Sequence, residues 1–118
     1  MEQTVEQLST RLTAIASTQR MRILAAVAAE TTHVSELARR LQMSRALLYM
    51  HLQRLEEAGF VTGRFELSDD GKALKFFEPV PFDLHVDLGT VTAAVAASPH
   101  PSPDLPELPI SRKASDPT

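Results

Sequence analysis

The stretch "SRALLYMHLQRLEEAGF", residues 44–60, carries leucines at helical spacing and ends in a glycine followed by a phenylalanine. At about 100° per residue, Leu48, Leu52 and Leu55 lie within an arc of about 60° and predict the buried face of a helix. Ser44, in front of this run, is a suitable N-cap residue. The stretch therefore predicts a helix buried along its leucines, with its opposite face left exposed.

That opposite face begins without an acidic residue. Arg45, Tyr49 and Gln53 follow one another along it, and Glu56 and Glu57 come only in the last turn. The first residues of a DNA-recognition helix enter the major groove, where a carboxylate repels phosphates and can pair only with cytosine. The pattern favours a DNA-reading face over a merely solvated one. The residues predicted to contact DNA from this helix are Ser44, Arg45, Ala46, Tyr49, Met50, Gln53 and Arg54.

The chain shows no pattern of catalytic residues. It has no glycine-rich phosphate loop, no Ser-His-Asp order and no pair of carboxylates in a plausible cleft, so we expect neither an enzyme nor a cofactor. His51 lies beside Leu48 and Leu55 on the helical wheel. We predict that it is a hydrogen-bonded structural histidine rather than a catalytic residue or a metal ligand.

Helical periodicity also precedes the central stretch. A first helix is predicted over about residues 4–17, with one apolar stripe, and a second over about residues 18–30. A short third helix starts near Thr32 or His33, where Glu36 is placed to act as a capping-box acid. "QMS", residues 42–44, is then a tight turn that ends at the N-cap residue Ser44, and Gly59 predicts a left-handed end to the fourth helix. The stripe of the first helix consists of Val5, Leu8, Leu12 and Ile15.

After Phe60 the periodicity changes. "FVTGRFELSDDGKALKFFEPV", residues 60–80, predicts two β-strands around the turn signal "SDDG". Helix, turn, helix and hairpin form the plan of a winged helix-turn-helix, in which the hairpin is the wing. Basic residues flank the wing, but Asp69 and Asp70 occupy its tip, which makes the tip a poor clamp for phosphate. The predicted DNA contacts outside the fourth helix are Ser35, Arg64 and Lys72, and Lys75 also flanks the hairpin.

Beyond the hairpin, apolar and polar residues alternate. Phe82, Leu84, Val86 and Leu88 alternate with Asp83, His85 and Asp87, which predicts a half-buried strand or an extended arm. "TVTAAVAA", residues 90–97, adds one or two helical turns. Six of the eight prolines fall in the last 20 residues, so residues 98–118 are predicted to be a flexible tail, and a docking peptide is the alternative.

These patterns predict one domain over residues 1–97, followed by the tail. The expected fold class is mainly α with a small β-hairpin: four to five helices, a two-stranded wing and a short C-terminal strand or arm. The 118 residues include no cysteine, which excludes disulfides, thiolate metal sites and cysteine nucleophiles. Neither a membrane span nor a signal peptide is visible, and we expect a cytoplasmic protein. Net charge is −3, but residues 36–64 hold five arginines against three glutamates.

Two segments resemble the ArsR/SmtB family of bacterial and archaeal repressors. "AIASTQRMRIL", residues 14–24, is similar to the opening signature of that family, and "VSELARRLQMSRALLYMHLQRLEEAGFV", residues 34–61, is similar to its helix-turn-helix. The resemblance covers about residues 8–80. It implies a homodimer that binds an inverted repeat of double-stranded DNA as a transcriptional repressor. The subunits would join through the first helix and the segment after the wing, giving the expected dimerisation residues Val5, Leu8, Leu12, Ile15, Leu84, Val86 and Leu88.

Many members of that family are released from DNA by a metal, and this chain departs from both of their motifs. Val34 and Ser35 stand where such members carry cysteines. Asp83 and His85 resemble the first half of a C-terminal zinc site, but its second half would fall on Ala96 and Pro99. One Asp and one His do not complete a site of three or four ligands, so no metal is expected.

Two alternatives to a self-contained DNA regulator remain open. A winged helix can serve as a protein–protein interaction module, which the acidic wing tip and the proline-rich tail would suit. Alternatively, a DNA-binding chain of this kind can leave sensing to a partner protein, because no small-molecule or metal site is evident in the sequence.

Overall fold

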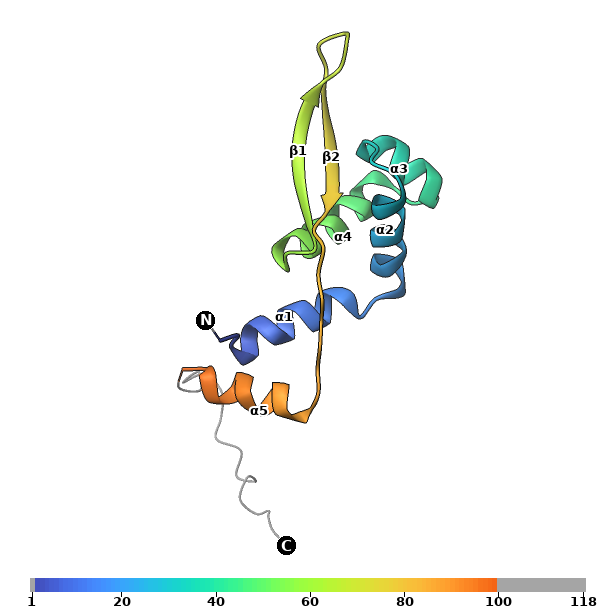
Figure 1. The fold of residues 1–118 in the computed structure, drawn as a ribbon. Coiled ribbons are helices and arrows are strands. Elements are labelled where there is room, and N and C mark those ends of the chain that lie inside the picture. Colours follow the sequence, from blue (N-terminus) through green and yellow to red (C-terminus); the bar gives the residue numbers. More distant parts are fainter. Residues whose placement is uncertain (1, 100–118) are drawn as a thin grey trace, which may run out of the picture.

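Over residues 2–99, the part that the computed structural model describes, the chain forms five helices and one antiparallel hairpin (Figure 1). The mainly helical fold class with a small wing, predicted from sequence, is confirmed. The elements are α1 (Val5–Ile15), α2 (Thr18–Ala29), α3 (Val34–Leu41), α4 (Arg45–Glu57), β1 (Val61–Leu67), β2 (Ala73–Pro79) and α5 (Leu88–Ala97). Most of the predicted tail, residues 100–118, lies outside the described residues.

The helices begin at side chains that accept a hydrogen bond from the backbone N–H three residues on. Thr4, Ser17 and Ser44 do so for α1, α2 and α4, which satisfies donors that a helix start leaves unpaired. At α3 the N-cap is His33, whose Nδ1 accepts from the N–H of Glu36 at 3.3 Å. The predicted capping-box role of Glu36 is wrong, because its carboxylate turns to two arginines further along α3.

The core lies where α2, α3 and α4 meet the base of the wing. Leu48, Leu52 and Leu55 of α4 are fully buried, as their spacing predicts. They pack in one cluster with Ile23 and Leu37 of α2 and α3. Burial of a leucine side chain contributes about 1.5–3 kcal/mol, so the three leucines strongly determine which way α4 faces.

Two residues end their helices in the left-handed region. Gly59 follows α4 with φ +87°, as predicted, and Phe60 N–H then donates to Leu55 O at 2.9 Å. Gln42 follows α3 with φ 56°, a conformation that costs a residue with a Cβ about 1–2 kcal/mol. Its N–H donates to Arg39 O at 3.2 Å, and Met43 N–H donates to Ala38 O at 3.0 Å. These bonds hold the tight turn that sets α4 against α3.

The segment that follows the wing is an arm rather than a strand. Residues 80–87 pair with no strand among the described residues, and they run from the wing base to α5 (Figure 1). Val80 N–H donates to Phe60 O at 2.9 Å, and the Phe82 ring lies 4.5 Å from that of Phe60. Of the two structures predicted for this segment, the arm is therefore found.

Helix α5 packs against α1, at the end of the molecule opposite the wing (Figure 1). Leu8 and Ala94 are buried there. Ser98, the first residue of the expected tail, belongs to this contact, because its hydroxyl accepts from Val5 N–H and donates to Ala94 O, both at 2.8 Å. At ten residues, α5 is longer than the one or two turns predicted.

Candidate nucleic-acid interface

The first half of α4 presents its polar face outward. Arg45 and Ala46 are exposed, while Tyr49 and Met50 keep 43% and 46% of their surface accessible. Ser44, also exposed, is the N-cap residue. In this half, the exposed face begins with N–H groups at the positive end of a helix dipole and carries no carboxylate, and both features suit an approach to DNA phosphates.

Arg45 is held in place by the preceding helix. Its Nη1 donates to Ser35 Oγ at 3.1 Å, which links the first turn of α4 to the first turn of α3. The remaining guanidinium donors stay available, because one hydrogen bond uses only one of five. Two residues predicted separately as DNA contacts therefore lie together at one edge of the helix-turn-helix.

This edge borders a cleft of about 380 Å³ between the helix-turn-helix and the wing, which we call the wing cleft. Its lining contains the basic side chains Arg45, Lys72 and Lys75 and no carboxylate. A phosphate strand could enter such a cleft without meeting an acidic group. The lining residues are His33, Val34, Ser35, Arg45, Tyr49, Phe65, Lys72, Ala73, Leu74 and Lys75.

Strand register decides which wing cations reach this cleft. Phe65 pairs with Lys75, and the Lys75 ammonium lies 4.4 Å from the centre of the Phe65 ring. Lys75 is absent from the DNA contacts predicted from sequence. Only the pairing of β1 with β2 shows that its side chain lies beside Phe65, on the side of the wing that lines the cleft. The sequence showed only that Lys75 follows Lys72 by three residues, which does not tell on which face of the hairpin its side chain lies.

Arg64 has a different environment. Its guanidinium donates to Glu78 at 3.1 Å and to Glu66, and it lies 5.1 Å from the centre of the Phe76 ring. The hydrogen bond to Glu78 is the largest of the effects that raise the pKa of Arg64. The charge of this predicted DNA contact is thus compensated within the wing.

The tip of the wing is negatively charged. Asp70 accepts from the Ser68 hydroxyl and from Lys72 N–H, and these hydrogen bonds lower its pKa. Asp69 beside it is exposed. Gly71, with φ +84°, closes the turn. The tip is therefore folded around a carboxylate, and the basic groups lie along the sides of the wing instead.

The second half of α4 faces different surroundings. The Gln53 amide donates to Glu57 at 3.3 Å. Arg54 lines a cleft with α1 and Arg20 rather than the wing cleft. Among the predicted contacts on α4, the structure thus brings Arg45 and Tyr49 to the wing cleft and turns Arg54 toward α1.

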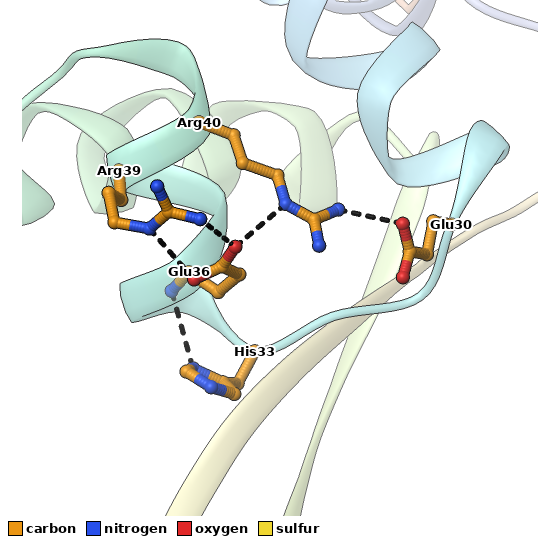
Figure 2. Close-up of polar contacts among 5 residues, drawn as sticks. All are labelled: Glu30, His33, Glu36, Arg39 and Arg40. Carbon is orange, nitrogen blue, oxygen red and sulfur yellow. Dashed lines mark hydrogen bonds and ion pairs between the residues drawn. The ribbon is translucent and has the colours of Figure 1, made fainter.

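A network of ion pairs fixes α3 relative to α2. Figure 2 shows the Glu36 carboxylate between two guanidiniums: Arg40 Nε donates to it at 2.9 Å, and Arg39 binds it as well. Arg40 also reaches Glu30 after the end of α2, at 2.8 Å. The hydrogen bond from Arg39, followed by that from Arg40, lowers the pKa of Glu36 to about 2. These exposed pairs orient α3 and leave two of its cations neutralised.

His51 has the structural role that its position predicts. It is buried, with Arg20 Nη1 at 3.0 Å from its Nδ1 and Gln19 Oε1 at 3.0 Å from its Nε2. This arrangement suits the neutral ring, which accepts at Nδ1 and donates from Nε2. Burial, followed by the charges of Arg20 and Arg54, lowers the pKa of His51.

Acid should therefore destabilise the fold through His51. Since its folded-state pKa is below the unfolded value of about 6.5, the unfolded state binds more protons between the two values. The stability due to neutral His51 is complete above about pH 6.5 and is lost as pH falls through the folded-state pKa. We expect the thermal unfolding midpoint to fall between about pH 7 and pH 5, and to fall less in His51→Gln. An equal fall in both proteins would contradict this role.

Asp83 and His85, the weak metal candidates, both lie on the exposed arm. His85 Nε2 is 3.0 Å from Asp87 Oδ2. Asp87 itself caps α5, where hydrogen bonds from Thr90 N–H, His85 and the Thr90 hydroxyl, in that order, lower its pKa to about 2. Within residues 2–99, no three His, Asp or Glu side chains come together in a way that could hold a metal ion.

The expected dimerisation residues fall into three environments. Leu8 is buried within the single chain, so its side chain has no surface left for contact with a second subunit. Val86 and Leu88 are exposed, Leu88 by 78%, and Val91 and Val95 of α5 extend the same kind of surface with 38% and 55% exposed. The half-buried members of the set are Val5, Leu12, Ile15 and Leu84.

Comparisons with known proteins agree with this geometry. Residues 15–64 match the family model of a helix-turn-helix domain. HlyU from Vibrio cholerae has 25% sequence identity and a TM-score of 0.54 over 78% of this chain and 88% of that one. Its reduced form has 23% identity and a TM-score of 0.52, with 74% and 80% covered. The crystal structure of an ArsR family transcriptional regulator has 24% identity and a TM-score of 0.52, with 81% and 87% covered. No curated protein matches the sequence.

The matched domain and the wing define the class, a winged helix-turn-helix protein of the kind found in DNA-binding regulators. Within that class, the fold is similar to that of the ArsR family regulator, in agreement with the resemblance seen in the sequence. None of the helices in the described part is long and apolar enough to cross a membrane.

Proposed function

We propose that the protein is a sequence-specific transcriptional repressor that binds an inverted DNA repeat as a homodimer, with α4 in the major groove. One observation carries the proposal: Arg45 and Tyr49 stand exposed on the first turns of α4, beside a cleft that holds three basic side chains and no acid. The first half of α4 would read the bases. In protein–DNA complexes, a bidentate contact from Arg to guanine is the commonest specific contact, and Arg45 would make it here.

The wing cleft would hold the sugar-phosphate strand next to that major groove. Lys72 and Lys75 lie on the wing side of the cleft and Arg45 on the helix side. The acidic tip argues against deep entry of the wing into the minor groove, since Asp69 and Asp70 would be repelled by the phosphates on either side. In this arrangement the wing contributes backbone contacts, and the specificity comes from α4.

Selection from a random DNA pool tests the function directly. A repressor of this kind should enrich an inverted repeat whose half-sites are about 10 bp apart, the spacing that places two recognition helices on one face of the duplex. Binding with equal affinity to every sequence at physiological salt would contradict the proposal, because contacts to phosphates alone carry no sequence information.

Lys75 and Arg64 provide a matched comparison within the wing. Lys75→Gln is expected to weaken DNA binding several-fold on all sequences and to reduce the slope of log affinity against log salt by about one. Arg64→Gln removes the same charge, but this charge is already compensated by Glu66 and Glu78, so the slope should stay unchanged. Electrophoretic mobility shifts at three or more salt concentrations give the affinity and the salt slope of both variants. A salt slope that falls in Arg64→Gln but not in Lys75→Gln would place the DNA on the other face of the wing.

Dimerisation is proposed to use the apolar surface of the arm and α5. Five large apolar side chains remain 38% to 78% exposed there in a single chain: Phe82, Val86, Leu88, Val91 and Val95. An apolar surface of this kind at one end of a small domain marks an interaction site. Because α5 lies at the end opposite the wing (Figure 1), a second copy bound there would leave both recognition helices accessible.

A further inference from the structure

A second polar cleft, of about 230 Å³, lies between α1, α2 and α4, away from the wing. We call it the interhelix cleft. Hydroxyl groups line it from α1, a guanidinium enters from α2, and a guanidinium and a carboxylate enter from α4. The residues that supply these groups are Ser9, Thr10, Thr13, Arg20, Arg54 and Glu57. Neither the proposed DNA contacts nor the proposed dimer surface gives this cleft a role.

Arg20 is a fixed cation at one side of the cleft. Its Nε donates to Ala14 O at 2.7 Å and its Nη2 to Thr13 O at 3.3 Å, while Nη1 lies 3.0 Å from His51 Nδ1. Three hydrogen bonds hold the guanidinium, and a guanidinium has five N–H donors. Two donors therefore remain for a ligand on a group that needs no reorientation.

Arg54 is the second cation. Its guanidinium forms no ion pair with any of residues 2–99. Its charge is, after burial and the charge of Arg20, one of the causes that lower the pKa of His51. The carboxylate of Glu57 also lines the cleft and accepts from the Gln53 amide. Two guanidiniums against one carboxylate leave a formal charge of +1 in the cleft, and an anion would relieve the repulsion between the two cations.

We infer that the interhelix cleft binds a small phosphate- or carboxylate-bearing anion between Arg20 and Arg54. Fork-shaped guanidiniums match the oxygen geometry of such groups, and the α1 hydroxyls add further donors. The volume of the cleft is below the 300–1,000 Å³ or so of typical organic-ligand pockets, which selects a compact anion. Since α1 packs on α5 and α4 bears the reading face, such an anion would join the two parts of the fold.

Inorganic phosphate is the first probe, used on the 118-residue chain without DNA. Backbone amide shifts in NMR spectra should move saturably with phosphate at constant ionic strength, and the movement should centre on Thr10 and Thr13. Arg54→Gln should weaken this binding about tenfold or more, as expected for the loss of a charged hydrogen-bonding group. Arg22→Gln removes the same charge from the exposed side of α2, outside the cleft, and should leave the binding unchanged.

Three outcomes would overturn the inference. Equal weakening in Arg54→Gln and Arg22→Gln would show a general charge effect, and shifts that follow ionic strength without saturating would show screening alone. The third outcome is that free phosphate does not bind, while Arg54→Gln lowers DNA affinity equally on all sequences and reduces the salt slope by about one. That result would assign Arg54 to a DNA phosphate. Because the titration contains no DNA, its result is independent of whether the proposed repressor function holds.

Discussion

The double substitution Arg45→Ala with Tyr49→Ala is expected to abolish sequence-specific DNA binding, lowering affinity for the selected operator at least about a hundredfold. Each good bidentate base contact discriminates by about 1–3 kcal/mol, and Tyr49 adds an exposed aromatic surface in the same cleft. Both side chains lie outside the core, so the unfolding midpoint should change little. Fluorescence anisotropy with operator and with scrambled DNA measures both affinities.

Arg11→Ala serves as the control for that experiment. It removes one positive charge from α1, outside the lining of the wing cleft, and should leave the ratio of operator to scrambled affinity intact. The prediction fails if the double variant retains that ratio while both affinities fall together. In that case Arg45 and Tyr49 would only contribute to backbone binding, and base reading would lie elsewhere.

The second large effect is expected from Leu88→Asp, which should convert the proposed dimer to a monomer and reduce operator affinity about a hundredfold or more. A charge placed in an apolar interface cannot be solvated there, and the loss of one subunit removes the gain from binding two half-sites at once. Leu88 is the first residue of α5, where an acidic side chain is favourable to the helix dipole. The substitution should therefore leave the fold of the chain intact.

Leu67→Asp is the matched control, because this wing leucine is 77% exposed against 78% for Leu88. It introduces the same change of charge and size at the end of the molecule opposite α5 (Figure 1). Sedimentation equilibrium of the two variants should give a monomer for Leu88→Asp and a dimer for Leu67→Asp. A dimer in both cases would move the interface away from α5 and the arm.

Local regularities were readable from the sequence because they depend on residues a few positions apart. Leu48, Leu52 and Leu55 face one way because they are four and three residues apart. Ser44 caps the helix that follows it, and Gly59 is free to adopt the left-handed conformation that ends it. These three features sufficed to orient α4 and to expose Arg45 and Tyr49. The winged helix-turn-helix plan follows from them and from the change of period after Phe60.

Pairings across elements could not be read in this way. Arg64 and Lys75 are both basic residues of the hairpin, but antiparallel pairing gives Arg64 a carboxylate partner in Glu78 and leaves Lys75 in the wing cleft. Glu36 shows that competition within one helix is also hard to read: it had the spacing of a capping acid, yet two guanidiniums of α3 attract its carboxylate more strongly than one backbone N–H does.

The amino-acid order alone thus determined which segments of this protein become helices and hairpin, and which face of α4 is buried, because turn geometry and apolar spacing act within one element. Tertiary structure alone decided which charged side chains meet across elements. It set Arg54 beside Arg20 and α1, Arg45 on Ser35, and residues 80–87 as an unpaired arm. The physical reason is that electrostatic and hydrogen-bond energies depend on distances through space. For residues far apart in the sequence, their positions along the chain do not give those distances.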